Sequence, residues 1–336
     1  MIGSSALATF SAHGGRVAAA RAMFGGADWI DLSTGIAPWA WPIGDVPLGF
    51  DRLPEPVEIA ALEVAAARAF GVADPAGVVA VPGTDMAMRL LAPLLAAQRP
   101  AVVQPGYAGH RAAWPDAVPV PAPIPAPVPA PVLATPAVAE HDLLVLASPA
   151  NPDGRITDSD ALLALAQSMT LVVDEAYADP SAGLCGRADD GLIVLRSFGK
   201  FYGLPGVRLG FVVTGRHVGD RLRAMLGDWP ISSAAVAIGT AAYGDTAWRR
   251  MQQERIGETG ALLDRLLDGA GLPILGSAPL FRLIACDRAV DLFDLLARHA
   301  ILTRPFADRD DRLRIGLPRG AAGLTRLAAA LEEFRP

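Results

Sequence analysis

Lysine is almost absent from this sequence of 336 residues. Lys200 is its only lysine, and all other Lys or Arg positions are arginine, so this one amine is the first candidate for a chemical role. Cysteine is scarce too, and Cys185 and Cys286 are too far apart to suggest a disulfide framework or a metal-binding spacing. The sequence therefore predicts no metal site, and it favours a reducing compartment.

Long hydrophobic runs are also missing. No uninterrupted apolar stretch reaches about 18 residues, the length that suggests a membrane-spanning helix. The N-terminus, MIGSSALATFSAHGG, lacks the basic start and long apolar core of a signal peptide. We therefore expect a cytoplasmic protein that does not insert into a membrane.

Positive charge is not in excess. The formal net charge is −6, which argues against a nucleic-acid partner because such partners require clustered Lys and Arg. With 52% hydrophobic and 19% charged residues, the chain has ample apolar material for a core. Its length exceeds what one core usually supports, so we expect a large domain and a smaller one.

Short apolar runs recur along the first two thirds of the chain and are typical of strands buried on both faces. Ala/Leu-rich stretches with helical spacing, such as Met86–Ala97 and Ser159–Met169, lie between several of them. This alternation predicts an α/β fold with a mostly parallel central sheet. The expected strands are Val78–Val81, Ala101–Val103, Leu143–Leu146, Leu171–Val173, Ile193–Leu195 and Leu209–Val213.

The chain changes character towards its end, where long helical stretches alternate with short strands and predict a small α+β domain. We place an N-terminal arm with part of the small domain at 1–45, a large domain at 46–236 and the small domain at 237–336. The arm shows little periodicity. Residues 115–136 alternate Pro with Ala or Val, which favours an extended polyproline conformation. A rigid connector is the favoured interpretation, and a recognition motif for a proline-binding module is the alternative.

The segment SFGKFYGLPGVRLGF, Ser197 to Phe211, follows one of the expected strands. Lys200 stands between a glycine and an aromatic residue, in surroundings that favour a neutral, nucleophilic amine and thus a Schiff base. Arg208 supplies a fork of donors that suits a phosphate. A solvated surface lysine and a Ser-Lys hydrolase pair are the alternatives.

The segment LVVDEAYAD places Asp174 at the end of another expected strand and Tyr177 shortly after it. This is the carboxyl edge of the sheet, where ligands of α/β proteins bind. There Asp174 can keep a ring nitrogen protonated, which makes a pyridoxal ring an electron sink. A strand-ending aspartate that caps a helix is the alternative.

Three further turns follow strand ends. Asn151 and Gly154 lie in SPANPDGR, where the Asn amide can donate to a ring oxygen or simply form an Asn-Pro turn. The amides of residues 83–85 start a helix and form a natural phosphate seat, although ordinary capping by Thr84 or Asp85 also explains them. Tyr107 can stack on a planar cofactor or pack on the surface.

These features occur in one order along successive strand ends, and that order resembles fold-type I pyridoxal-phosphate (PLP) enzymes of the class I/II aminotransferase family. The resemblance implies that Lys200 binds PLP covalently, that Asp174 pairs with the pyridine nitrogen, and that Asn151 and Tyr177 contact the ring hydroxyl. It also implies a homodimer. The expected catalytic residues are Lys200, Asp174 and Tyr177, and the expected cofactor contacts are these three with Gly83, Thr84, Asp85, Tyr107, Asn151, Ser197 and Arg208.

The two ends of the chain are similar to one branch of this family, the enzymes that decarboxylate L-threonine O-3-phosphate for cobalamin biosynthesis. His13–Gly25 contains a His-Gly-Gly stretch, and Asp28–Pro42 contains Asp-Leu-Ser-Thr-Gly-Ile. Near the other end, Arg304 and Arg314 look like the arginines that grip a substrate carboxylate. The resemblance implies (R)-1-amino-2-propanol O-2-phosphate as the product. The expected substrate contacts are His13, Ser33, Thr34, Gly35, Asn151, Arg304 and Arg314, the first four for the substrate phosphate.

Two departures and two rival functions remain open. The Pro-rich segment replaces a more ordinary stretch, and Asp153 stands where relatives commonly have Thr. Transamination of histidinol phosphate or a related amino acid would use the same residues. A non-catalytic protein of the same fold, which docks on another cobalamin-pathway enzyme through the Pro-rich segment, is the second rival.

Overall fold

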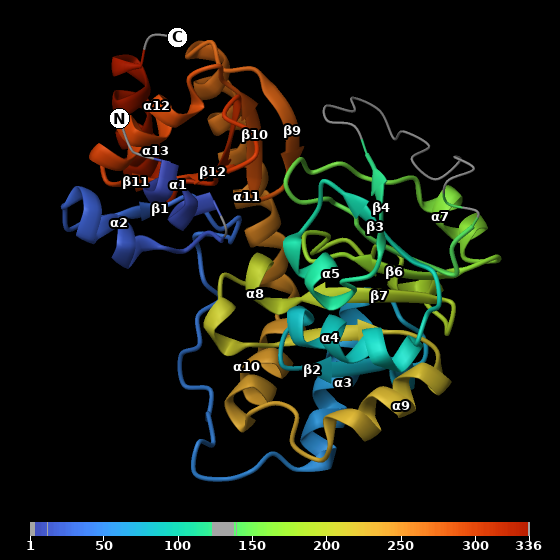
Figure 1. The fold of residues 1–336 in the computed structure, drawn as a ribbon. Coiled ribbons are helices and arrows are strands. Elements are labelled where there is room, and N and C mark those ends of the chain that lie inside the picture. Colours follow the sequence, from blue (N-terminus) through green and yellow to red (C-terminus); the bar gives the residue numbers. More distant parts are fainter. Residues whose placement is uncertain (1–3, 12, 123–137, 139, 335–336) are drawn as a thin grey trace. The chain divides into compact units, whose positions relative to one another are not determined.

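The computed structural model describes residues 4–11, 13–122, 138 and 140–334, and its chain forms two units (Figure 1). The larger unit comprises residues 40–151 and 155–251. The smaller unit comprises residues 1–39, 152–154 and 252–336. One division falls between Met251 and Gln252, inside helix α11 (Thr246–Gly269), whereas the sequence analysis placed a boundary at 236/237.

A seven-stranded sheet forms the centre of the larger unit. All of its strands run in one direction except β8, which is antiparallel to both of its neighbours, so the expected α/β fold with a mostly parallel sheet is confirmed. The strand order is β2 (Val78–Val81), β8 (Gly210–Val213), β7 (Leu192–Ser197), β6 (Thr170–Asp174), β5 (Leu143–Ala147), β3 (Pro100–Gln104) and β4 (Val118–Pro121).

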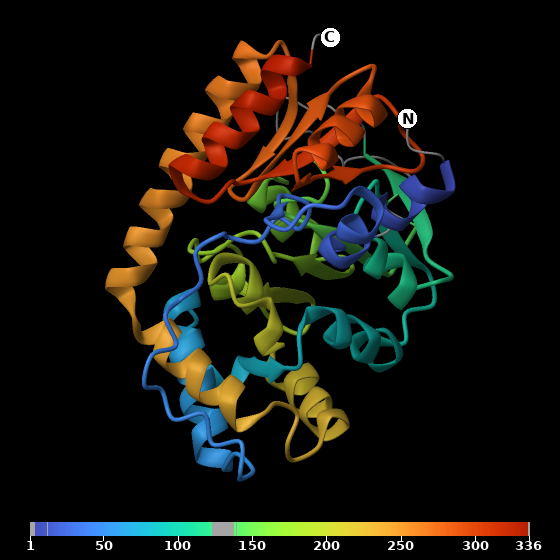
Figure 2. The ribbon, with the colours of Figure 1, turned by 90° about the vertical axis from the view of Figure 1, so that its left-hand side faces the viewer.

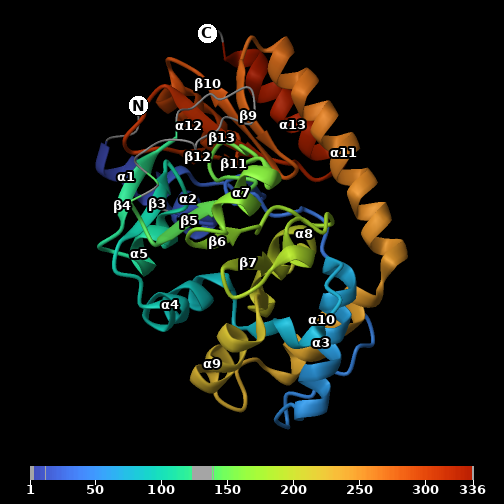
Figure 3. The same ribbon diagram turned by 90° about the vertical axis from the view of Figure 1, so that its right-hand side faces the viewer.

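Helices cover both faces of this sheet (Figure 3). Helices α4 (Thr84–Leu95) and α9 (Arg216–Leu226) share an apolar cluster with Val212, while the rings of Phe70 and Tyr243, from α3 (Pro56–Phe70) and α10 (Ser233–Gly244), pack on Phe211. Adjacent strand residues face opposite sides, so the two helix pairs lie on opposite faces. Shorter helices lie before β2 or in the segments between strands: α5 (Ala108–Ala113), α7 (Ser159–Leu165), α8 (Phe198–Phe201), η1 (Pro75–Gly77), η2 (Cys185–Arg187) and η3 (Pro205–Val207).

The beginning of the Pro-rich segment is strand β4, which corrects the expectation of a polyproline conformation there. Ala122 donates its N–H to the Gln104 carbonyl oxygen, and the N–H groups of alternate residues point the same way along a strand. Pro119 and Pro121 therefore occupy the positions that need no donor towards β3. Proline on the outer side also blocks further pairing at this sheet edge. The rest of the predicted segment, residues 123–136, lies outside the described residues.

The smaller unit contains a four-stranded antiparallel sheet in the order β12-β13-β10-β9 and a two-stranded sheet of β1 and β11. The C-terminal part of α11 and α13 run side by side along the four-stranded sheet (Figure 2). The elements are α1 (Ser4–Ser11), α2 (Val17–Phe24), β1 (Ile30–Asp31), β9 (Ile274–Ala278), β10 (Phe281–Ala285), α12 (Ala289–Arg298), β11 (Ile301–Leu302), β12 (Arg304–Pro305), β13 (Arg312–Gly316) and α13 (Gly320–Glu333).

Helices α1 and α2 form in the N-terminal arm although its sequence shows little periodicity. Phe10 of α1 and Phe24 of α2 lie with their ring centroids 5.4 and 6.4 Å from that of Phe293 in α12. This packing buries one side of each short helix, and tertiary contacts of this kind outweigh weak periodicity. Among the residues described, no helix has the length and apolar character to cross a membrane.

Candidate active site

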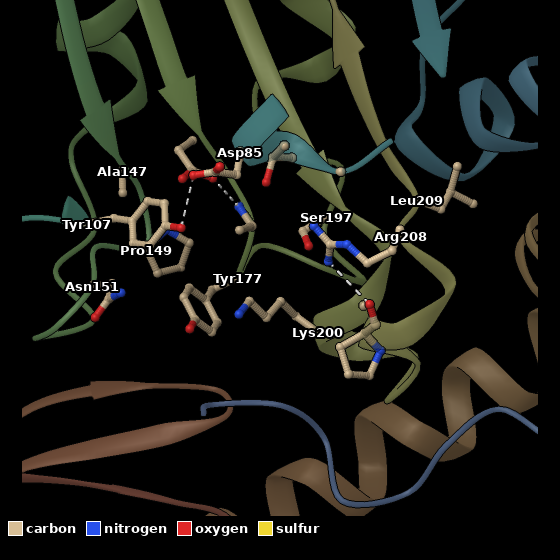
Figure 4. Close-up of a pocket in the computed structure, with 16 residues that line it drawn as sticks. Asp85, Tyr107, Ala147, Pro149, Asn151, Tyr177, Ser197, Lys200, Arg208 and Leu209 are labelled. Atoms are coloured by element: carbon tan, nitrogen blue, oxygen red, sulfur yellow. Dashed lines mark hydrogen bonds between the residues drawn. The ribbon is translucent and has the colours of Figure 1, made fainter. Parts of the chain in front are cut away.

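The carboxyl ends of the parallel strands β2, β3, β5, β6 and β7 meet at one edge of the large sheet and surround a cavity of about 150 Å³ (Figure 4). The segment leading into the antiparallel strand β8 joins them, because the start of β8 lies at this same edge. All ten residues with a predicted cofactor role line the cavity: Gly83, Thr84, Asp85, Tyr107, Asn151, Asp174, Tyr177, Ser197, Lys200 and Arg208.

Lys200 lies in the short helix α8, directly after β7. Phe198 and Phe201 of the same helix are buried, and the Phe198 ring stacks on Tyr202 with centroids 4.5 Å apart. These rings anchor α8 in the core, while the Lys200 side chain is half-buried and lines the cavity. Its Nζ lies 5.4 Å from the centroid of the Tyr177 ring, so the amine and the phenol are neighbours (Figure 4).

Asp174 ends strand β6 and is buried. Its Oδ1 accepts the N–H of Ala176, and its Oδ2 lies 3.0 Å from Nε2 of His110, which is fully buried in α5. The sequence analysis missed His110. A detectable signal was its place three residues after Tyr107 at the start of a helix, since residues three apart lie on one helix face. The carboxylate is thus held from two sides.

The N-terminus of α4 and Arg208 together form an anion site. Gly83 has φ +92°, and a Cβ there would lie 2.7 Å from an Arg208 guanidinium nitrogen, so glycine lets the cation approach the helix start. The first N–H groups of a helix lack intrahelical acceptors and attract anions. Arg208 itself is in the left-handed region, and its Nη1 donates to the Pro205 carbonyl oxygen. This donor set fits the phosphate of pyridoxal phosphate.

Asp85 would repel a phosphate if its carboxylate faced the anion site. Instead Oδ1 accepts a hydrogen bond from the Tyr107 hydroxyl at 3.2 Å, and Oδ2 accepts one from Arg89. Burial and the nearby Asp85 charge raise the pKa of Tyr107 to about 12. Tyr107 therefore stays a hydrogen-bond donor at neutral pH and is fixed beside the cavity.

The segment after β5 closes as a turn in which Ala150 donates its N–H to the Arg155 carbonyl oxygen. Asn151, within this turn, lines the cavity. Asp153 and Gly154 belong to the smaller unit, where a Cβ on Gly154 would collide with the backbone of Ser277. Gly154 thus allows a close approach of two backbones.

The other predicted substrate contacts lie in the smaller unit. Arg304 is opposite Arg314 in the β12–β13 pair, and Arg314 Nη2 donates to the Ser33 carbonyl oxygen at 2.6 Å. The Ser33 hydroxyl donates to Asp31 and accepts the N–H of Gly15. The structure therefore brings Ser33 and the two arginines together. Thr34 is half-buried, Gly35 is buried and His13 is exposed.

The fold and this cavity define an α/β protein whose only lysine faces a buried aspartate and an anion site. The family model for aminotransferase class I and II matches residues 50–331, and the chain belongs to this family. It is 37% identical to a threonine-phosphate decarboxylase of Pseudomonas aeruginosa, a match that covers 96% of this chain and 98% of the relative. It is 39% identical to a threonine-phosphate decarboxylase of a Sinorhizobium species, covering 95% and 97%.

A solved structure has a closely similar fold. The histidinol-phosphate aminotransferase of Sinorhizobium meliloti, in complex with pyridoxal 5'-phosphate, superposes with a TM-score of 0.80 at 25% identity. The match covers 94% of this chain and 93% of that chain. This aminotransferase is therefore similar in fold over most of the chain, while the two decarboxylases share more of its sequence.

Proposed function

We propose that this chain is a PLP-dependent threonine-phosphate decarboxylase, which converts L-threonine O-3-phosphate to (R)-1-amino-2-propanol O-2-phosphate in cobalamin biosynthesis. The observation that carries the proposal is one cavity in which the single lysine, the Asp174–His110 pair and the Arg208–α4 anion site converge. Support for the substrate comes from relatives of that name that match nearly the whole chain.

Each cavity residue has a role that follows from its position. Bound PLP supplies an electron sink that stabilises negative charge at the substrate Cα. Lys200 would hold the cofactor covalently through its amine, and the same amine would carry the proton that the product needs. Asp174, fixed by His110 and the Ala176 amide, keeps the ring nitrogen protonated. Asn151 and Tyr177 would hold the ring hydroxyl, and Tyr107 would pack on the ring; all three line the cavity.

The choice of the bond that breaks depends on how the substrate is oriented. Arg314, helped by Arg304, would bind the substrate carboxylate and hold the substrate so that the bond between Cα and that carboxylate is the one that breaks. The forked guanidinium suits a carboxylate because it can donate two parallel hydrogen bonds. His13, Ser33, Thr34 and Gly35 are the proposed contacts of the substrate phosphate, and Asn151 also lies against the substrate.

Transamination of histidinol phosphate or a related amino acid is the second candidate, favoured by the structural likeness to an aminotransferase. The two functions differ in their products. Incubation with L-threonine O-3-phosphate should release carbon dioxide. Release of no carbon dioxide, together with glutamate formation from histidinol phosphate and 2-oxoglutarate, would establish the aminotransferase instead.

The cofactor is tested by the absorbance of the purified protein. We expect a band near the edge of the visible range that is lost in Lys200→Ala. Reduction of the PLP-loaded wild-type protein with borohydride should leave the cofactor bound to one tryptic peptide. Lys200 is the only side-chain amine to which it can be attached. The exposed Arg216→Ala variant is the control and should keep the band. A colourless wild-type protein that borohydride leaves unmodified in the presence of PLP would exclude the proposal.

The oligomeric state, the location and a rival non-catalytic role each need a separate proposal. We propose a homodimer, as the family resemblance implies, and a cytoplasmic location. Sedimentation of the purified protein tests the dimer. The rival is a non-catalytic partner of another cobalamin-pathway enzyme that docks through the Pro-rich segment. It would be supported if the protein bound PLP, turned over no amine, and lost its partner on deletion of residues 117–134.

A further inference from the structure

A buried ionic cluster lies directly beside the catalytic segments of β6 and β7. Arg196 is completely buried and donates to Glu175 Oε2 at 3.0 Å and to Asp179 Oδ1 at 2.8 Å. It also donates to the Ser181 carbonyl oxygen at 2.8 Å, and its guanidinium carbon lies 4.8 Å from the centroid of the Phe70 ring. No predicted site residue belongs to this cluster.

The three charged residues alternate in sequence with residues of the cavity. Glu175 follows Asp174, Arg196 precedes Ser197, and Asp179 comes two residues after Tyr177. Successive side chains of a strand point to opposite faces, which explains why Arg196 turns away from the cavity that Ser197 lines. The cluster is thus connected to the cavity through the backbone.

The cluster fixes both ends of the loop that carries Tyr177. Glu175 begins this loop and also accepts the N–H of Leu184 at 2.9 Å, while Arg196 holds Asp179 and the Ser181 carbonyl in its middle. A Cβ on Gly183 would collide with the Glu175 carboxylate, so the loop closes tightly over this acid. Arg196 is therefore bonded to the loop on both sides of Tyr177, through Glu175 before it and through Asp179 and Ser181 after it.

Charge keeps the cluster together in the protein interior. Burial raises the pKa of Glu175, which Arg196 opposes as the nearest positive charge. Burial alone would lower the pKa of Arg196, yet Asp179 and Glu175 raise it overall. A buried charge that loses its partner is strongly unfavourable, so each member depends on the others.

We propose that Arg196 is a positioning residue which, through Glu175 and Asp179, holds the Tyr177 hydroxyl at the site where Lys200 binds its cofactor. Tyr177 and Lys200 are already neighbours, with 5.4 Å from the amine to the ring centroid. The inference rests on the proposed PLP chemistry of Lys200. A small displacement of the loop would alter the proposed contact between Tyr177 and the ring hydroxyl, and hence the acidity of the lysine-cofactor linkage.

The test uses the absorbance of the PLP-loaded protein as a function of pH. Asp179→Asn keeps the shape of the side chain but weakens its bond to Arg196. We expect it to shift the pH midpoint of the cofactor band in the same direction as Tyr177→Phe, by about 0.5 pH unit or more. In the Tyr177→Phe background, Asp179→Asn should add no further shift, because the two substitutions act through one hydroxyl.

A matched control separates positioning from stability. Glu63 also bonds an arginine, Arg223, at 3.2 Å, and it accepts the N–H of Ala80 on β2, an edge strand. Glu63→Gln should lower the melting temperature without moving the midpoint. Glu175→Gln is the second variant of the cluster. It takes the place of Asp179→Asn in the same pH titration if Asp179→Asn does not fold.

The outcomes distinguish the two ideas. An unchanged midpoint in both cluster variants, with cofactor bound, would overturn the role of Arg196 and leave the proposed function intact. Shifts that simply add to that of Tyr177→Phe would also overturn it, because Arg196 would then act by another route. A wild-type protein that binds no PLP would overturn the proposed function and this inference with it.

Discussion

At the level of single residues, hydrogen bonds hold the buried Asp174 carboxylate in place at the cavity. Its two oxygens are each bonded, one to the Ala176 amide and the other to the His110 ring, and both side chains of that pair are almost inaccessible to solvent. A buried carboxylate needs such partners because burial without them is costly. The two contacts also fix the direction in which the carboxylate faces the cavity.

Replacement of His110 by Phe should lower kcat/KM about 10- to 100-fold, because a hydrogen bond to a charged group contributes about 1.5–3 kcal/mol. Steady-state kinetics on L-threonine O-3-phosphate measure the effect, with the melting temperature recorded in parallel. His141→Phe, at a histidine whose ring bonds the Arg99 carbonyl oxygen, is the control and should keep full activity. Equal activity of wild type and His110→Phe would show that the contact has no catalytic value.

The site residues next to strand ends could be predicted from the sequence, whereas the residues that hydrogen-bond to them could not. Lys200, Asp174 and Arg208 follow or precede apolar runs, and the structure brings them to one cavity. The pair of His110 and Asp174 spans 64 residues and depends on β5 lying between β3 and β6. Periodicity gives strands but not their order, so such contacts escape a reading of local patterns.

Single elements show how backbone groups at their ends are satisfied. Helix α3 begins with Pro56 after the N-cap Glu55, and Glu58 reaches back to the Glu55 N–H at 2.8 Å. Arg52 adds a two-pronged bond to the Glu58 carboxylate. Three donors to one acid lower the pKa of Glu58 to about 2, first through Arg52 and then through the Glu55 amide. The start of α3 is thus stabilised by an ionised carboxylate.

The stability that Glu58 contributes should depend on pH in a defined direction. Its pKa in the folded protein, about 2, is below its ordinary value of 4.5, so the contribution is complete above pH 4.5 and is lost as the pH falls towards 2. The melting temperature of Glu58→Gln should therefore be below that of wild type at pH 7 and approach it near pH 2. Exposed Glu258→Gln is the control. A difference that persists unchanged at pH 2 would contradict the charged cap.

At the scale of the molecule, the proposed tasks are divided between the two units. All residues that line the cofactor cavity belong to the larger unit, while Arg304, Arg314 and the predicted contacts of the substrate phosphate belong to the smaller one. The smaller unit is discontinuous in sequence, and its segment 152–154 interrupts the larger one next to Asn151. Composition along the chain cannot show such a discontinuity, because it compares only neighbouring stretches of sequence.

This division predicts that cofactor and substrate binding can be impaired separately. Arg314→Lys keeps the charge but loses the fork, so KM for L-threonine O-3-phosphate should rise about 10- to 100-fold, the equivalent of one or two charge-assisted hydrogen bonds. Its cofactor band should be unchanged. Arg208→Lys should instead leave KM unchanged and release PLP faster on dilution, because Arg208 lies at the anion site of α4.

Arg314 also donates to the Ser33 carbonyl oxygen and lies 4.8 Å from the Phe281 ring centroid, so folding must be checked by its melting temperature. Arg312→Lys, two residues earlier on β13 and bonded to Asp311, is the matched control and should leave KM unchanged. If Arg314→Lys lost the cofactor band while KM stayed constant, Arg314 would serve the PLP site and the assignment of the carboxylate to the smaller unit would be wrong.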